Sequence, residues 1–238
     1  MPRTRELSDA PAPLVQHLSE LRRRVGIALA AVVAGGIITF AWCDNLIALL
    51  RTPLNDTPLY FVGVGDAFGI RMQLSFIGGV ALAMPIWLWQ AWAFIRPGLT
   101  ESERRAARPW IPLALALFLI GIAVAWVVLP FAVSFLLSFA TEDLTPLIAA
   151  DRYFGFVGSL MLVFGLATEY PIVLVLLSRV GIVTSAKLRR WRRNALVLAV
   201  VVGAFATPGT DLISPIVLSA VLYLLYELTI WLVRVGGR

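Results

Sequence analysis

Long apolar runs, separated by short charged segments, dominate the chain. Several of these runs exceed the roughly 18 residues that mark a membrane-spanning helix. We therefore expect an all-α integral membrane bundle of six transmembrane helices, which forms a single polytopic domain over residues 1–238. The six predicted helices cover residues 25–42, 72–95, 110–129, 154–178, 194–207 and 216–233.

The fifth predicted helix, residues 194–207, is shorter than the others. Its length at 1.5 Å per residue is roughly 21 Å, against a hydrocarbon core of roughly 30 Å. The sequence TPGTDLISP at residues 207–215 contains two prolines, a glycine and Asp211, so the helix must end there. We expect the fifth and sixth helices to form a short hairpin, with the bilayer thinned near Asp211.

Positive charge is distributed unevenly between the two ends of the predicted helices. Of the 20 Lys and Arg residues, 17 fall on the side that carries the N-terminus, and only Arg51, Arg71 and Arg152 fall on the other side. Because loops rich in Lys and Arg stay in the cytoplasm, we predict that both termini are cytoplasmic. Residues 1–24 are then a cytoplasmic segment, residues 25–233 the transmembrane region and residues 234–238 a cytoplasmic end.

The composition argues against several classes of protein. Cys43 and His17 are the only cysteine and histidine, so we expect neither an intramolecular disulfide nor a Cys/His metal cluster. The chain has no HExxH motif and no P-loop, and its histidine lies before the first predicted span, where it cannot form a buried Ser–His dyad. The net charge of +6 follows from the positive-inside rule rather than from nucleic-acid binding. We expect a protein that is not an enzyme and uses no cofactor.

One carboxylate lies inside an apolar helix. Glu169, in FGLATEYP at residues 164–171, lies on the order of 14 Å into the bilayer. An ionised group at that depth costs about 3 kcal/mol or more, so Glu169 must be neutral, paired or in a wet cavity. Pro171 has no N–H for the carbonyl of Ala167, and Thr168 adds a hydroxyl. Glu169 either makes an internal hydrogen bond that fixes helix packing or forms a polar site for a partner or substrate segment.

Three other carboxylates have both a structural and a functional interpretation. Glu20 lies in PLVQHLSELRRR, whose apolar spacing predicts a short amphipathic helix along the interface, and it can either pair with Arg24 or bind a cation. Glu103 follows Thr100 with the spacing of a capping box. Asp211 can cap the sixth helix. For Glu103 and Asp211, the local chemistry does not decide between capping and binding.

Taken in order, several stretches resemble the TatC family, the multispanning receptor component of the twin-arginine protein translocase. The resemblance covers nearly the whole chain and implies six spans, cytoplasmic termini and a concave bundle. It implies that the chain recognises signal peptides and exports folded proteins across the bacterial cytoplasmic membrane, driven by the proton motive force. The matching stretches are HLSELRRR, RTPL, MPIWLWQAWAFIRPGLTESERR, FGLATEYP, GIVTSAKLRRWRR, TPGTD and YLLYE.

The resemblance also implies partners and a signal-peptide site. The implied partners are the single-span TatA and TatB subunits, twin-arginine signal peptides and the lipid bilayer, in a multi-copy complex. Glu20 and Glu103 match the family positions credited with signal-peptide contact, and an arginine fork can bind a carboxylate through two charge-assisted hydrogen bonds. The neighbouring motif residues are Arg22, Phe94, Arg104 and Arg105.

The resemblance further implies an intramembrane site. Glu169 and Pro171 match an intramembrane Glu-x-Pro whose glutamate faces the concavity and contacts a partner helix or an inserting signal peptide. Pro53 and Asp211 match outer-loop residues of the family.

The chain departs from the family pattern at two places. It has TPGTD and Pro215 where the family commonly has TPPD and a glutamine, and Thr168 stands where a phenylalanine is frequent. A proton-coupled small-solute carrier is the alternative function, because a membrane carboxylate can serve as a proton relay. Against the carrier, we find no second deeply buried ionisable group on another predicted helix.

Overall fold

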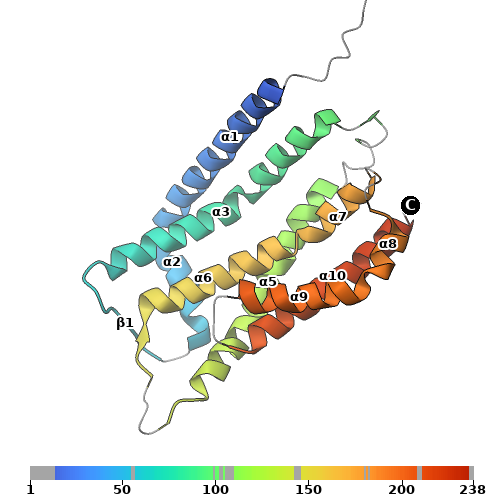
Figure 1. Cartoon of the computed structure of the whole chain (residues 1–238). Coiled ribbons are helices and arrows are strands. Elements are labelled where there is room, and N and C mark those ends of the chain that lie inside the picture. The colour runs from blue at the N-terminus through green and yellow to red at the C-terminus, as the bar shows by residue number, and fades with distance from the viewer. Residues whose placement is uncertain are drawn as a thin grey trace, which may run out of the picture.

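The described residues form long helices that lie side by side (Figure 1). This computed structural model describes residues 14–54, 57–98, 100–101, 104, 110–141, 146–179, 181, 183–207 and 211–235. In Figure 1, α1 and α3 lie on one flank of the bundle and α9 and α10 on the other, with α5 and α6 between them. Helices suit a bilayer because they satisfy their own backbone hydrogen bonds. The prediction of an all-α membrane bundle is confirmed.

The described residues of the first half of the chain form three long helices and several short elements. Two of the short elements, α2 and the 3-10 turn η1, follow α1, and the 3-10 turn η2 ends α3. Their bounds are α1 Leu14–Ala41, α2 Cys43–Arg51, η1 Thr52–Leu54, β1 Leu59–Tyr60, α3 Asp66–Ile95, η2 Arg96–Gly98 and α5 Trp110–Leu137.

The described residues of the second half of the chain form five helices and one short strand. Strand β2 pairs in parallel with β1, with Leu59 opposite Ile148 and Tyr60 opposite Ala149. The pairing therefore joins the loop after η1 to the start of α6. The bounds are β2 Ile148–Ala149, α6 Ala150–Ala167, α7 Tyr170–Arg179, α8 Ser185–Arg190, α9 Arg192–Ala206 and α10 Ile213–Val235.

Five of the six predicted apolar helices are present as continuous helices, the fourth is divided into α6 and α7, and α5 extends beyond its predicted end. Within the described ranges, five helical segments are long and apolar enough to cross a membrane, with α6 and α7 counted as one segment. The sixth, α9, has 15 residues, about 22 Å, which confirms the predicted short helix. The sequence places the end of the third helix at residue 129, before Pro130, whereas α5 continues to Leu137. Tight packing of this stretch explains the continuation, because Leu129 and Ala132 are fully buried.

The amphipathic segment before the first span differs from the prediction. The sequence suggests a separate helix along the interface, but residues 14–24 continue directly into the span as part of α1. The 28 residues of α1 reach about 42 Å, so its first turns extend beyond a hydrocarbon core of about 30 Å. No proline interrupts the helix, and Glu20 pairs with Arg24 one turn later, which supports continuous helix.

The fourth predicted span is broken near its middle. The sequence predicts one helix over residues 154–178, whereas α6 ends at Ala167 and α7 begins at Tyr170. Pro171 explains the break, because it has no N–H for the helical bond to Ala167. The amide of Glu169 instead donates to the oxygen of Leu166, three residues back, at 3.1 Å.

Helices α1 and α3 approach closely through glycines. A Cβ added to Gly35 would lie 2.9 Å from the main-chain oxygen of Gly79, and one added to Gly79 would lie 2.7 Å from the nitrogen of Gly36. Small residues at such crossings allow the two backbones to pack directly, which is how membrane helices commonly associate. This close crossing sets the distance between the facing sides of the two helices.

Candidate functional site

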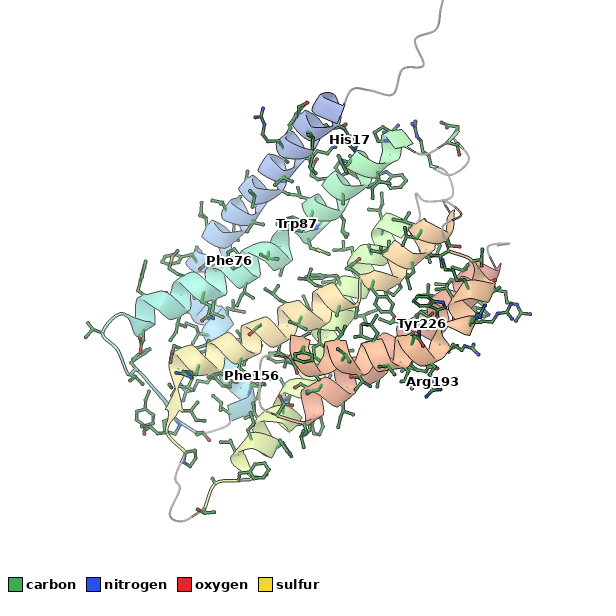
Figure 2. The ribbon with its side chains drawn as sticks, viewed as in Figure 1. His17, Phe76, Trp87, Phe156, Arg193 and Tyr226 are labelled. Carbon is green, nitrogen blue, oxygen red and sulfur yellow. The ribbon has the colours of Figure 1, made fainter. Side chains whose placement is uncertain are left out.

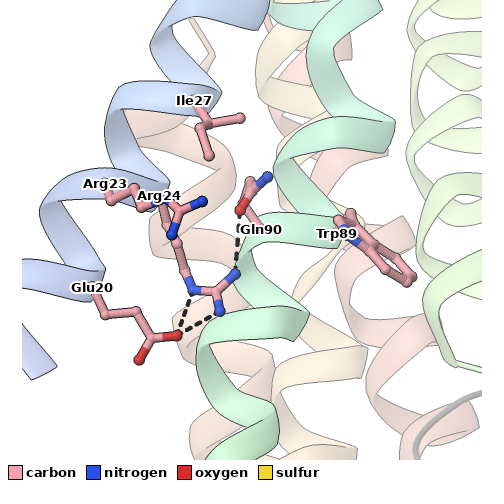
Figure 3. Close-up of a pocket in the computed structure, with 6 residues that line it drawn as sticks. All are labelled: Glu20, Arg23, Arg24, Ile27, Trp89 and Gln90. Carbon is pink, nitrogen blue, oxygen red and sulfur yellow. Dashed lines mark hydrogen bonds and ion pairs between the residues drawn. The ribbon is translucent and has the colours of Figure 1, made fainter.

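Glu20 and Arg24 form an ion pair on α1, beside α3 (Figure 3). The Arg24 guanidinium donates from Nε at 3.0 Å and from Nη2 at 2.5 Å, and both bonds go to Oε1 of Glu20. Its Nη1 donates to Oε1 of Gln90 on α3 at 3.3 Å. The i, i+4 pair proposed from the sequence is therefore formed. Gln90 is a third member that the sequence analysis missed, because it lies 66 residues away along the chain.

A small open pocket surrounds this pair (Figure 3). Its volume is about 260 Å³, below the range of about 300–1,000 Å³ that is typical for drug-sized ligands. A pocket of this size suits one side chain. Among the described lining residues Glu20 is the only acid and Arg23 and Arg24 are bases, so the Glu20 carboxylate is the charged acceptor that a cationic side chain would use there. The lining residues are Glu20, Arg23, Arg24, Ile27, Trp89 and Gln90.

Other residues of the predicted signal-peptide site lie at the same ends of α1 and α3. Phe94 stacks on His17, with ring centroids 4.4 Å apart, and Figure 2 labels His17 at this end of the bundle. Nε of Arg104 donates to the oxygen of Arg96 at 3.0 Å, which ties the residue after η2 back to the turn. Arg22 is exposed on α1. Glu103 and Arg105 lie outside the described residues.

Thr168 lies at the break between α6 and α7 and contacts α5. Its hydroxyl lies 2.9 Å from the main-chain oxygen of Leu117 and 2.7 Å from that of Gly165. Thr168 is 1% exposed and Pro171 is buried. A Cβ added to Gly121 on α5 would meet the backbone of Gly165 at 2.9 Å, so the two helices are in direct contact here. The break therefore packs directly against α5.

Glu169 is half-buried and keeps part of its hydrogen-bonding capacity unused. Among the described residues, its Oε1 is buried and has no hydrogen-bond partner. Leu166 and Val173, three residues before and four after Glu169, are 45% and 55% exposed. Residues at this spacing share one side of a helical segment, so Glu169 lies beside an exposed apolar surface. The internal hydrogen bond considered from the sequence is not formed within the described part of the chain.

Asp211, one of the two predicted outer-loop residues, has a structural role. Oδ1 of Asp211 accepts a hydrogen bond from the amide of Ser214 at 2.6 Å, so Asp211 caps the start of α10. Its Oδ2 and the Ser214 hydroxyl are buried and have no partner among the described residues. Pro53 lies in η1, next to the buried Leu54. The capping role considered for Asp211 is confirmed.

A second carboxylate within a membrane span was missed from the sequence. Glu227 on α10 accepts from Nη2 of Arg192 at 2.7 Å and from the hydroxyl of Tyr223 at 3.1 Å. Figure 2 shows Tyr226 and Arg193 in this region, where α8, α9 and α10 meet. The signal was present, because YLLYE places a glutamate inside an apolar run. This carboxylate is neutralised by an arginine, unlike Glu169.

No group of three metal-ligating side chains comes together within the described ranges. Two of the described carboxylates lie where a ligand or partner helix could approach: Glu20 beside a pocket at one end of α1, and the half-buried Glu169 at the break between α6 and α7. The first suits a cationic side chain, and the second suits a hydrogen-bond donor on an apolar segment.

The sequence and the structure of this chain are both similar to those of one family of known proteins. The family model described as "Sec-independent protein translocase protein (TatC)" matches residues 16–220. A TatC protein of Frankia casuarinae is 36% identical, over 96% of this chain and 67% of the relative. One from Carboxydothermus hydrogenoformans is 34% identical, over 96% of this chain and 95% of the relative. A crystal structure described as a twin arginine translocase receptor, TatC, superimposes with a TM-score of 0.80 at 34% identity, covering 93% of this chain and 100% of the other.

Proposed function

This chain belongs to the TatC family of Sec-independent protein translocases, and from this premise we propose that it binds twin-arginine signal peptides at Glu20. It is a multispanning membrane protein of a translocase, and its proposed role is recognition and transport without a catalytic step. The observation that carries the proposal is the Glu20 carboxylate, which already holds one guanidinium beside a pocket sized for a side chain. Arginine is the side chain that this chemistry selects.

We propose that further residues around this pocket complete the signal-peptide site. Arg22, Phe94 and Arg104 lie near the same ends of α1 and α3, and Glu103 and Arg105 belong to the adjoining loop sequence. A second carboxylate from Glu103 would provide for the second arginine of the pair. This division assigns one carboxylate to each guanidinium.

Glu169 is the proposed contact for a second segment within the membrane. The Glu169 carboxyl group is half-buried beside exposed apolar residues, so a helix that packs there and carries a hydrogen-bond donor would bind the exposed part of this group. We propose that this helix belongs to a single-span subunit of the TatA or TatB type, or to an inserting signal peptide. Pro171 and Thr168 support the site by fixing the helix break.

The proposed location is the bacterial cytoplasmic membrane, with both termini in the cytoplasm and several copies in a complex driven by the proton motive force. The charge distribution supports this orientation. The start of α1, the end of α3 and the end of α10 lie toward one end of the bundle, and the β1–β2 pair lies at the other (Figure 1). Arginines are concentrated toward the first end, as the positive-inside rule requires of a cytoplasmic face.

Crosslinking to a signal peptide tests the proposal. Membranes containing the full chain are exposed to a twin-arginine signal peptide that carries a photocrosslinker. We expect Glu20→Gln to reduce the crosslinked fraction at unchanged protein abundance, whereas Asp44→Asn, which changes an exposed acid at the opposite end, leaves it unchanged. Undiminished crosslinking in a Glu20→Gln/Glu103→Gln double variant would refute the assignment.

A further inference from the structure

We propose that the junction of α8 and α9 binds anionic phospholipids of the surrounding membrane. The proposed site has two parts. The first is the basic segment, which we define as residues 187–193, and the second is the apolar stripe on α9, which we define as Leu196, Val197, Val200 and Val201. The site lies on the flank of the bundle formed by α9 and α10, away from α1 and α3 (Figure 1).

The basic segment carries a dense positive charge that is largely uncompensated. Five of its seven residues are Lys or Arg, and the sequence has no acid between Glu169 and Asp211. Arg192 is neutralised, because its Nη2 donates to Oε2 of Glu227 at 2.7 Å. The other four cations are exposed and form no ion pair within the described ranges: Lys187, Arg189, Arg190 and Arg193. Four or more cations immediately beyond a membrane span attract anionic lipid headgroups.

The positive-inside rule accounts for the side of the membrane on which these charges fall. It does not account for their concentration in one short segment, nor for the apolar stripe that follows them. These two features are what a phospholipid requires, because its charged headgroup and its acyl chains must be bound one above the other.

Packing of α8 against α10 holds the basic segment in place. Leu188 is 5% exposed and belongs to a buried cluster that includes Val175 and Ile230. Its main-chain oxygen accepts a hydrogen bond from the Tyr226 hydroxyl at 2.9 Å. With Leu188 directed into the bundle, the basic side chains on either side of it are exposed. Trp191 is also exposed, and tryptophan favours the membrane interface, where lipid headgroups lie.

The apolar stripe continues directly from Arg193. Its four residues follow Arg193 by three, four, seven and eight positions, which places all five side chains on one face of α9. The stripe residues are 44–57% exposed, and Figure 2 shows Arg193 at the outer edge of the bundle. From Arg193 to Val201 the helix rises about 12 Å, most of the roughly 15 Å depth of one hydrocarbon leaflet. A phosphate bound by Arg193 would therefore lay its acyl chains along the stripe.

Charge favours an anionic phospholipid over a zwitterionic one. A guanidinium forms charge-assisted hydrogen bonds to phosphate oxygens, and a lipid without its own ammonium keeps its net negative charge for the remaining cations. A soluble phosphate would meet the same cations but would gain nothing from the apolar stripe. The two parts together therefore select a phosphate that carries acyl chains.

Lipid binding to the purified full chain tests the proposal. Native mass spectrometry in a neutral detergent measures dissociation constants for phosphatidylglycerol and phosphatidylcholine with identical acyl chains. We expect the unaltered chain to prefer phosphatidylglycerol. The double variant Arg189→Gln/Arg193→Gln should bind it about 10- to 30-fold more weakly, as expected from the loss of two cations near an anionic headgroup, and should bind phosphatidylcholine almost unchanged.

Arg51→Gln/Arg152→Gln is the matched control. It removes two exposed arginines from the opposite end of the bundle and should leave the affinity for phosphatidylglycerol unchanged. An equal loss in this control would mean that general charge, and not the basic segment, attracts the lipid. Equal binding of the two lipids by the unaltered chain would refute the proposal. So would undiminished phosphatidylglycerol binding by Arg189→Gln/Arg193→Gln protein with a normal gel-filtration profile.

Two further measurements identify the occupant. Excess glycerol phosphate, which has the headgroup charge without acyl chains, should not displace phosphatidylglycerol. Displacement would assign the site to a soluble phosphate instead. In membranes, a photocrosslinker placed at Val197 should capture phospholipid. Capture of a protein in place of lipid would mean that a partner helix covers this face of α9, and would overturn the inference.

Discussion

The Thr168 hydroxyl donates a hydrogen bond to the main-chain oxygen of Leu117, 2.9 Å away, and so joins the break between α6 and α7 to α5. Pro171 removes one helical hydrogen bond at this break, and the threonine supplies a contact between helices in the same place. Glu169 follows directly, so its carboxylate is presented from a fixed part of the backbone. A small hydroxyl residue at position 168 thus positions Glu169 through the backbone.

Replacing Thr168 with valine tests this link. The change preserves shape but removes the hydroxyl, and we expect a loss of about 1 kcal/mol of stability, seen as a lower unfolding midpoint in detergent. Thr229→Val is the control, because the Thr229 hydroxyl donates only to Leu225 within its own helix and should cost less. Equal losses in the two variants would show that the contact between helices adds nothing.

Glu169→Ala is expected to impair partner docking more than folding. Alanine is tolerated in lipid, so the variant should still fold. A hydrogen-bond donor on the partner helix would lose the Glu169 carboxylate as its acceptor, so docking should suffer. We expect a photocrosslinker placed at the exposed Val173 to capture less of a single-span partner, at normal protein abundance. Glu169→Gln keeps an acceptor oxygen and should retain more crosslinking. Intact crosslinking and intact export in Glu169→Ala would argue for a role in packing alone.

The α1–α3 crossing is expected to be intolerant of larger residues. A Cβ at Gly79 would lie 2.6 Å from the oxygen of Val32, so Gly79→Ala should force the helices apart and cost about 1–3 kcal/mol. Gly69→Ala on the same helix is the control, since nothing lies within 4 Å of its added Cβ. Thermal unfolding in detergent compares the two, and equal midpoints would contradict the close crossing.

Asp211 is expected to contribute chiefly through its cap. Asp211→Ala removes the acceptor for the Ser214 amide and should cost about 1 kcal/mol, measured by thermal unfolding. Asp211→Asn keeps an acceptor oxygen and should retain most of the stability. A loss of export in a stable Asp211→Asn variant would instead assign a transport role to the charge.

The Cys43 thiol is expected to be unreactive in the folded chain. It is 0% exposed, and burial raises its pKa, so less of the reactive thiolate exists at neutral pH. A maleimide should label it slowly in mild detergent and rapidly in denaturing detergent, whereas Ser138→Cys, at an exposed position, provides a rapidly labelled control. Rapid labelling in mild detergent would contradict this burial.

The pKa of the Cys43 thiol is higher in the folded chain than in the unfolded chain. Stability from this group is therefore present at neutral pH and is lost as the pH rises through the folded pKa.

Several features of this protein are local and could be predicted from the sequence. Apolar length predicts each span, and the short run before TPGTD predicts a helix too short to cross comfortably, which α9 confirms. Spacing likewise predicts the Glu20–Arg24 pair and the cap from Asp211. In the ion pair and in the cap, the interacting groups are three or four residues apart, so backbone geometry alone brings them together.

The tertiary structure decided which distant residues meet. Gln90 reaches Arg24 only because glycines bring α1 and α3 close together, and Thr168 reaches Leu117 only because α5 packs on the helix break. Arg192 meets Glu227 through the packing of α9 on α10. Hydrophobicity and spacing fix how long a helix is and which groups it carries. They do not fix the angle and register at which two apolar helices cross, because those depend on side-chain packing over the whole contact.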